Sequence, residues 1–119
     1  MTNQSIPLIK QFVALIKIKP FDNFLEFVEE LADNMISDLD LKVVKKMSHI
    51  FSPAGITLAY ILSQSHLILH TYPENSVIHV DLVMCAKRSK KEFEKSLRYA
   101  LHNYVVYSIK VKTIDLRFG

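Results

Sequence analysis

Apolar residues at alternate positions near the start of the chain predict a β-strand over residues 10–18. One face of this strand would carry Phe12, Ala14, Ile16 and Ile18. Pro20 ends the strand, because proline has no N–H to donate to a neighbouring strand. A helix is then predicted from a side-chain cap at Asp22 or Asn23 to about Ser37. Its apolar stripe follows the helical period and comprises Phe24, Val28, Leu31 and Met35.

The middle of the chain is rich in short β-prone segments. Residues 41–51 are β-prone but mixed, and Pro53 and Gly55 mark a turn after them. Three short strands are predicted after this turn, at 56–63, 66–72 and 77–85. The connection before the last strand contains Pro73, Glu74, Asn75 and Ser76, which supply turn chemistry.

A second helix is predicted in the last third of the chain. Ser89 and Glu92 have the spacing of a capping box, and the helix would run from there to about Asn103. Residues 105–118 return to a β-prone pattern. The apolar stripe of this helix comprises Phe93, Leu97, Ala100, Leu101 and Tyr104.

Together these elements predict an α+β fold, a two-layer sandwich in which two helices cover one face of a mostly antiparallel sheet. The expected order is β-α-β-β-β-α-β, or β-α-β-β-α-β if two central segments merge. Alternation in the central strands places the apolar set Leu67, Leu69, Ile78, Val80, Leu82 and Met84 under the helices. The opposite face would carry the polar and reactive alternates, which include His66, His70, Tyr72, His79, Asp81 and Cys85. A partner subunit is expected to cover that face.

Composition narrows the class of protein. A chain of 119 residues, half of them apolar and only two glycine, fits one domain over 1–119. No apolar run is long enough for a membrane span, and the first residues lack a secretory pattern. A single cysteine cannot form an internal disulfide, so a cytoplasmic location is expected. The net charge is +3, and the basic cluster at 87–91 is interpreted as a solvated loop and first helical turn, not a nucleic-acid surface.

Three chemically capable residues lie at fixed intervals in the central strands: Ser65, His70 and Cys85. The surrounding segments read His-Ile-Phe-Ser-Pro-Ala-Gly-Ile-Thr at 49–57, Ser-His-Leu-Ile-Leu-His-Thr-Tyr-Pro-Glu at 65–74 and Val-Asp-Leu-Val-Met-Cys at 80–85. About a third of the chain thus resembles the core of the bacterial and archaeal S-adenosylmethionine decarboxylases. These are pyruvoyl-dependent lyases made as self-cleaving zymogens.

The resemblance implies autocatalytic cleavage between Gln64 and Ser65, giving fragments 1–64 and 65–119. Ser65 would become a pyruvoyl cofactor that forms a Schiff base with S-adenosylmethionine and serves as the electron sink for loss of carbon dioxide. The product would be the aminopropyl donor for spermidine in polyamine biosynthesis. The resemblance also implies a homodimer whose sheets stack with the helices outside.

Individual roles follow from the same resemblance. His70 would be the base of self-cleavage, assisted by the hydroxyl of Thr57, and Cys85 would be the proton donor in decarboxylation. The remaining matches are Phe51 and Tyr72, which would sandwich the adenine, and Glu74, which would bind the ribose hydroxyls. A metal site is not expected, because His66 and His70 are about 13 Å apart if they lie on one strand.

The chain departs from the family pattern at several positions. Gln64 replaces a glutamate, Leu58 replaces a glycine, and Met84 and Ala86 replace the threonine and glycine that flank the cysteine. The first strand lacks the D-x-Y-G-C-like run of many members. These differences leave two alternatives open: a pyruvoyl-dependent arginine or ornithine decarboxylase, and an unprocessed, non-catalytic paralogue.

Overall fold

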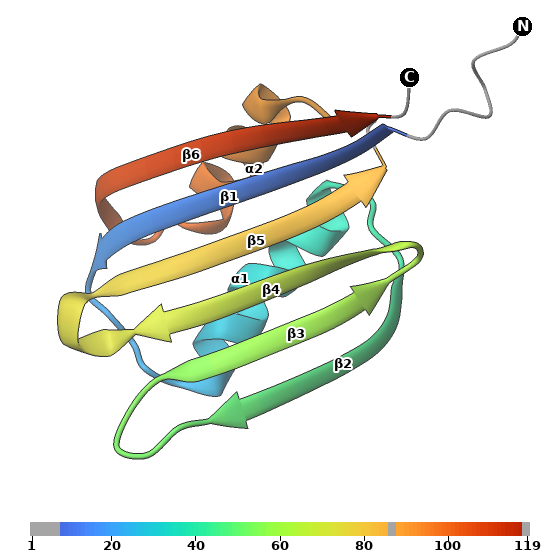
Figure 1. Cartoon of the computed structure of the whole chain (residues 1–119). Coiled ribbons are helices and arrows are strands. Elements are labelled where there is room, and N and C mark those ends of the chain that lie inside the picture. The colour runs from blue at the N-terminus through green and yellow to red at the C-terminus, as the bar shows by residue number, and fades with distance from the viewer. Residues whose placement is uncertain (1–7, 86–87, 118–119) are drawn as a thin grey trace, which may run out of the picture.

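The computed structural model describes residues 8–85 and 88–117. Within these residues the chain forms one antiparallel sheet with strand order β2-β3-β4-β5-β1-β6 and two helices. Figure 1 shows the sheet from its open face, with both helices behind it. In chain order the elements are β1 (Leu8–Lys19), α1 (Leu25–Asp38), β2 (Val43–Ile50), β3 (Ile56–Leu62), β4 (Ser65–Tyr72), the short 3-10 helix η2 (Pro73–Asn75), β5 (Val77–Cys85), α2 (Lys90–Ala100) and β6 (Val105–Arg117).

The two-layer α+β architecture predicted from the sequence is confirmed. The predicted number of strands between the helices is wrong, because the structure has four where the pattern predicted two or three. The additional strand is β2, formed from the segment that was only β-prone. β2 lies at the edge of the sheet, and all of its residues are exposed. An edge strand with no buried face has no reason to alternate, so the pattern could not distinguish it from a loop.

The core lies between the sheet and the helices. The predicted apolar alternates of β4 and β5 are all buried there, as are Phe12, Ala14, Ile16 and Ile18 of β1. Phe12 stacks on Phe93 of α2, with ring centroids 4.9 Å apart. Each fully buried Leu, Ile or Phe side chain contributes about 1.5–3 kcal/mol relative to an exposed one. This burial fixes which face of every strand is left for chemistry.

The start of α1 differs from the prediction. Phe24, not Asp22 or Asn23, occupies the N-cap, and its side chain is 66% exposed instead of joining the apolar stripe. The two predicted caps are used elsewhere: Asp22 accepts a hydrogen bond from the Tyr104 hydroxyl, and Asn23 accepts one from the Thr71 hydroxyl. Both tie the loop before α1 to other elements. The stripe is consequently completed by Phe27 in place of Phe24.

The start of α2 agrees with the prediction. Ser89 and Glu92 form the reciprocal capping box, with the serine hydroxyl accepting from the Glu92 N–H and the Glu92 carboxylate accepting from the Ser89 N–H. The helix ends at Ala100, three residues before the predicted Asn103. Neither described helix is long and apolar enough to cross a membrane.

Candidate active site

Among the described residues, the shortest side-chain hydrogen bond on the open face joins two neighbouring strands. Thr57 of β3 lies directly opposite His70 of β4, and Thr57 Oγ1 is 2.8 Å from His70 Nδ1. This hydrogen bond fixes the orientation of the imidazole ring and occupies Nδ1. Nε2 is therefore the nitrogen available to a substrate or to another protein group.

A cavity of about 410 Å³ adjoins this pair. Five of the residues singled out by the sequence line it: Phe51, Thr57, His70, Tyr72 and Glu74. They come from the loop after β2, from β3, from the end of β4 and from η2. Segments separated in the sequence are thus brought together at one end of the sheet.

Gly55 holds the wall of this cavity close to β4. Its φ is +107°, a conformation that other residues rarely adopt, and its carbonyl accepts a 2.8 Å hydrogen bond from the Phe51 N–H. A Cβ at this position would lie 3.4 Å from the carbonyl oxygen of Thr71. The neighbouring Ile56 N–H donates to the Thr71 hydroxyl. The loop that carries Phe51 is therefore fastened to the strand that carries His70.

The environment of His70 favours its neutral form. Burial, and then the charge that His79 carries when protonated, lower the pKa of His70 below its ordinary value, and Asp81 opposes the shift. A neutral imidazole at physiological pH can accept a proton, which is the property required of a general base.

Ser65 and Cys85 lie at the other end of the sheet. Ser65 begins β4 at the β3–β4 hairpin, and Cys85 ends β5 with its side chain exposed. The pairing of His66 with Val83 brings these two strand ends next to each other. Gln64, just before Ser65, has a φ of +61°, in the left-handed region that costs a non-glycine residue about 1–2 kcal/mol. The strain lies beside the bond that the sequence predicts to break.

The two groups do not meet within one chain. His70 is five residues beyond Ser65 on β4, a separation of about 16 Å along a strand. Alternation also turns the two side chains toward opposite faces of the sheet, since Ser65 shares the parity of buried Leu67. A single chain therefore presents two partial sites, with Thr57 and His70 in one and Ser65 and Cys85 in the other.

Between the partial sites lies a polar network that the sequence did not reveal. Asp81 accepts a hydrogen bond from the Gln11 amide at 2.9 Å, and its second carboxylate oxygen lies 3.4 Å from His66 Nε2. His79 lies directly opposite His70. Recognising these contacts required the strand register, although the alternation had already placed His79 and Asp81 on the open face. Among the described residues, no three His, Cys, Asp or Glu side chains are arranged to hold a metal ion.

The family departures have different structural settings. Leu58 is fully buried under the helices within the regular strand β3, and Met84 is likewise buried. These substitutions therefore add to the core and leave the open face unchanged. Ala86 lies outside the described residues.

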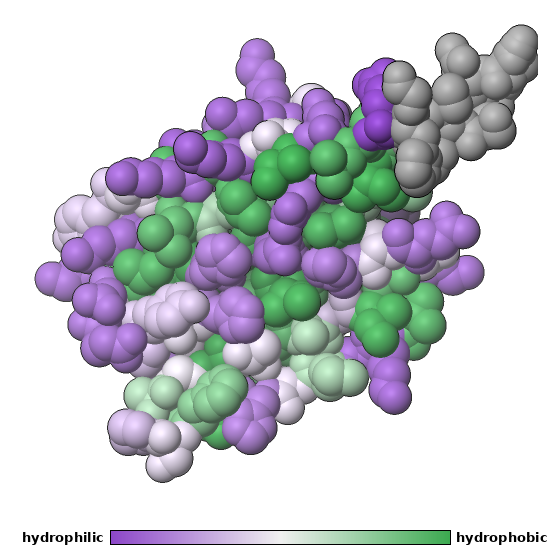
Figure 2. Space-filling view, in the orientation of Figure 1, coloured by the Kyte–Doolittle hydropathy of each residue, from purple (hydrophilic) through white to green (hydrophobic). Residues whose placement is uncertain are grey.

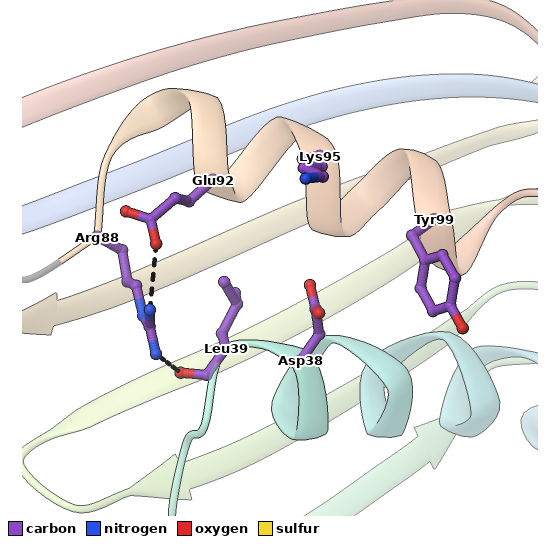
Figure 3. Close-up of a pocket in the computed structure, with 6 residues that line it drawn as sticks. All are labelled: Asp38, Leu39, Arg88, Glu92, Lys95 and Tyr99. Carbon is purple, nitrogen blue, oxygen red and sulfur yellow. Dashed lines mark hydrogen bonds and ion pairs between the residues drawn. The ribbon is translucent and has the colours of Figure 1, made fainter.

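A second cavity, of about 300 Å³, lies on the helix side and contains none of the predicted site residues. Figure 3 shows Arg88 reaching across it: its guanidinium donates to the carbonyl of Leu39 at 2.9 Å and to Glu92 at 3.1 Å. The carboxyl end of α1 carries the negative end of the helix dipole, and the positively charged guanidinium stabilises it. Arg88, within the basic cluster, thus links the two helices.

The open face combines these polar groups with apolar side chains, as Figure 2 shows. Several large apolar residues on it are about half exposed, among them Leu15, Met47, Ile61, Tyr72 and Ile114. An apolar surface of this kind, interrupted by specific polar groups, is typical of a protein–protein interface.

Comparisons with known proteins agree on one family. The family model described as S-adenosylmethionine decarboxylase matches residues 23–115. A Clostridium botulinum (strain Langeland) protein named S-adenosylmethionine decarboxylase proenzyme is 33% identical over 89 residues, covering 75% of each chain. The Archaeoglobus fulgidus protein of the same name is 26% identical over 90 residues, covering 76% of this chain and 79% of the relative. The crystal structure of the adenosylmethionine decarboxylase from Aquifex aeolicus superposes with a TM-score of 0.70 at 19% identity, covering 91% of this chain and 88% of that one.

Proposed function

Since the chain belongs to the S-adenosylmethionine decarboxylase family, we propose that it cleaves itself between Gln64 and Ser65 and then decarboxylates S-adenosylmethionine. The product would be the aminopropyl donor for spermidine. The single observation that carries this proposal is the hydrogen-bonded pair of Thr57 and His70, set in a cavity whose other walls are Phe51, Tyr72 and Glu74.

Self-cleavage requires a hydroxyl, a strained peptide and a base. The Ser65 hydroxyl attacks the carbonyl carbon of Gln64, and the peptide nitrogen leaves as the new amino terminus, so that an ester replaces the amide. Removal of the Ser65 Cα proton then expels the Gln64 carboxylate, and water converts the resulting enamine to a ketone with release of ammonia. The left-handed Gln64 supports the first step, because strain raises the energy of the reactant. His70 Nε2 is the proposed base of the second.

The pyruvoyl group formed in this way supplies an electron-accepting ketone for the decarboxylation. Ser65 lies at the β3–β4 hairpin, at the start of β4, and there the two new chain ends can separate after cleavage. Cys85 at the adjacent strand end is the proposed proton donor to the substrate carbon. A thiol in this role must stay reduced, which supports a cytoplasmic location.

The cavity residues suit a cationic nucleoside. Phe51 and Tyr72 offer aromatic faces to an adenine ring and to a sulfonium, and the Glu74 carboxylate can accept from ribose hydroxyls. Arginine and ornithine lack the flat apolar ring that two aromatic walls would stabilise. The cavity therefore favours S-adenosylmethionine over these amino acids.

The separation of the two partial sites supports a homodimer. If the open faces of two copies stack about a two-fold axis that runs between the sheets and across the strands, each Ser65 end meets the His70 end of the second copy. The half-exposed apolar residues of the open face supply the surface for such a contact. Two complete sites would form in each dimer.

The experiment that tests the proposal is intact mass spectrometry of the purified protein, followed by an assay of carbon dioxide released from S-adenosylmethionine. We expect wild-type protein to yield fragments 1–64 and 65–119, with a hydrazine-reactive ketone on the second. Ser65→Ala should remain one species of 13.7 kDa without activity. A wild-type chain that stays whole after prolonged incubation would favour the unprocessed paralogue, and activity on arginine or ornithine alone would favour the other alternative.

A further inference from the structure

A second histidine accompanies the proposed base. His79 of β5 lies directly opposite His70 in the register of β4 and β5, on the same open face. The two imidazole rings are 5.9 Å apart between centroids and nearly parallel, with an interplanar angle of 28°. His70 is therefore held between the hydroxyl of Thr57 on one neighbouring strand and the ring of His79 on the other.

The two rings differ in what surrounds them. His70 is partly desolvated and already has Nδ1 bound to Thr57. Two imidazoles at this distance disfavour double protonation, because like charges repel. Burial also disfavours placing a proton on His70.

Resting on the function proposed above, we propose that His79 is a positioning residue for self-cleavage: its imidazole, held beside that of His70, opposes the placement of a proton on His70, so that His70 remains a free base. The benefit is greatest on the acidic side of neutrality, where a single imidazole would begin to be protonated. His79 makes no contact with the reacting bond in this role and acts through His70.

Other charged groups on this face do not replace His79. Both carboxylate oxygens of Asp81, two positions along β5, are directed to Gln11 and His66. Asp81 raises the pKa of His70, opposite in sign to His79. Among the described residues, the other charged or titratable groups around the pair include Lys17 on β1, Lys110 on β6, His49 on β2, His66 and Tyr72 on β4, and Glu74 in η2. In the row of paired residues that crosses β3, β4 and β5, His79 is the imidazole directly adjacent to His70.

The first test is independent of cleavage. Imidazole resonances of His70 are followed by NMR as a function of pH in a Ser65→Ala chain, which stays whole. We expect the midpoint of His70 titration to move up with His79→Gln and down with His79→Lys, which places a permanent cation beside it. A general loosening of the sheet would move both variants in the same direction. Equal midpoints in all three chains would overturn the inference.

The second test measures the pH dependence of self-cleavage in chains with Ser65 intact. His79→Gln should cleave at the wild-type rate near pH 8 but more slowly near pH 6, by about threefold for each half-unit that the midpoint rises. A merely structural role would lower the rate equally at every pH, and that result would also overturn the inference. His102→Gln serves as the matched control, because His102 is exposed beyond α2 and bonded to the Tyr99 carbonyl.

The two tests separate the inference from the proposed function. If wild-type protein never cleaves while His79 still shifts the His70 titration, the proposed function fails and the coupling of the two rings stands. If wild-type protein cleaves but neither variant shifts the titration, the function stands and the role of His79 is wrong.

Discussion

At the residue scale, the Thr57–His70 hydrogen bond predicts that self-cleavage depends on the Thr57 hydroxyl. Thr57→Val keeps the shape of the side chain but removes the group that orients the imidazole, so self-cleavage should slow by up to about a hundredfold. Thr57→Ser keeps a hydroxyl and should stay close to wild type. The measurement is the rate at which fragments 1–64 and 65–119 appear by mass spectrometry. Equal rates for the valine and serine variants would remove Thr57 from the mechanism.

Cys85 makes a prediction of a different kind, because its proposed role comes after cleavage. Cys85→Ala should process to both fragments at the wild-type rate and then turn over S-adenosylmethionine about a hundredfold or more slowly, for lack of a proton donor. Fragment yield and released carbon dioxide are measured on the same sample. Full turnover by this variant would assign the proton to another group.

The sequence identified most individual residues of the cavity but not how they combine. Phe51, Thr57, His70, Tyr72 and Glu74 stood in motifs whose spacing could be read directly, and they line one cavity. The partnership of His70 with His79 depends on the register of two strands, which spacing along the chain does not determine. The distance between Ser65 and His70 also emerged only when both were placed on one extended strand.

At the scale of elements, alternation predicted those strands that bury one face and missed the strand that buries none. β4 and β5 alternate strictly because helices cover one side of them. β2 at the edge has no such constraint. The helix starts differ in whether their contacts are local. The capping box of α2 joins residues three apart in sequence and was predictable. Asp22 and Asn23 instead bond to Tyr104 and Thr71, which are distant in sequence, so the sequence did not show that they are not the cap of α1.

One contact between elements yields a stability prediction. The buried Tyr60 of β3 donates a 3.0 Å hydrogen bond to Asp33 of α1. Tyr60→Phe should lower the free energy of unfolding at pH 7 by about 1 kcal/mol. Urea unfolding measures this loss. Tyr107→Phe, which alters an exposed tyrosine on β6, is the matched control and should have little effect.

The same tyrosine predicts how stability depends on pH. Burial, then the bond to Asp33, raises the pKa of Tyr60 above its ordinary value. A raised folded pKa gives stability that is complete below the unfolded pKa of about 10 and is lost as the pH rises through the folded one. The difference between wild type and Tyr60→Phe should therefore narrow above about pH 10. A constant difference would show that Tyr60 titrates alike in both states.

At the scale of the whole molecule, the two partial sites lie at opposite ends of the sheet, and the proposed dimer brings them together by adding a second copy with its strands reversed. In the stacked dimer proposed above, each complete site takes Ser65 and Cys85 from one copy and Thr57 and His70 from the other. In this arrangement Ser65 and His70 of the same chain belong to different sites, although they are close in sequence. Mixing two variant chains therefore tests which chain supplies each residue of a site.

The prediction concerns co-expression of Ser65→Ala with His70→Ala, each of which should remain whole alone. In the mixed dimer, the Ser65 end of the His70→Ala chain faces the intact His70 of the Ser65→Ala chain. Random assortment places about half of the His70→Ala chains in mixed dimers, so about half of them should be cleaved. The Ser65→Ala chains should all remain whole. Mass spectrometry distinguishes the two chains directly.

The control places both substitutions on one chain and leaves the other chain wild type. When wild type is co-expressed with a Ser65→Ala, His70→Ala double variant, every site of the mixed dimer lacks one of the two residues. Wild-type chains in mixed dimers should then stay whole, although each carries both residues itself. If instead these chains are cleaved while the first mixture is not, His70 acts on Ser65 of its own chain, and the sheet must rearrange by about 16 Å along β4 before the bond can break.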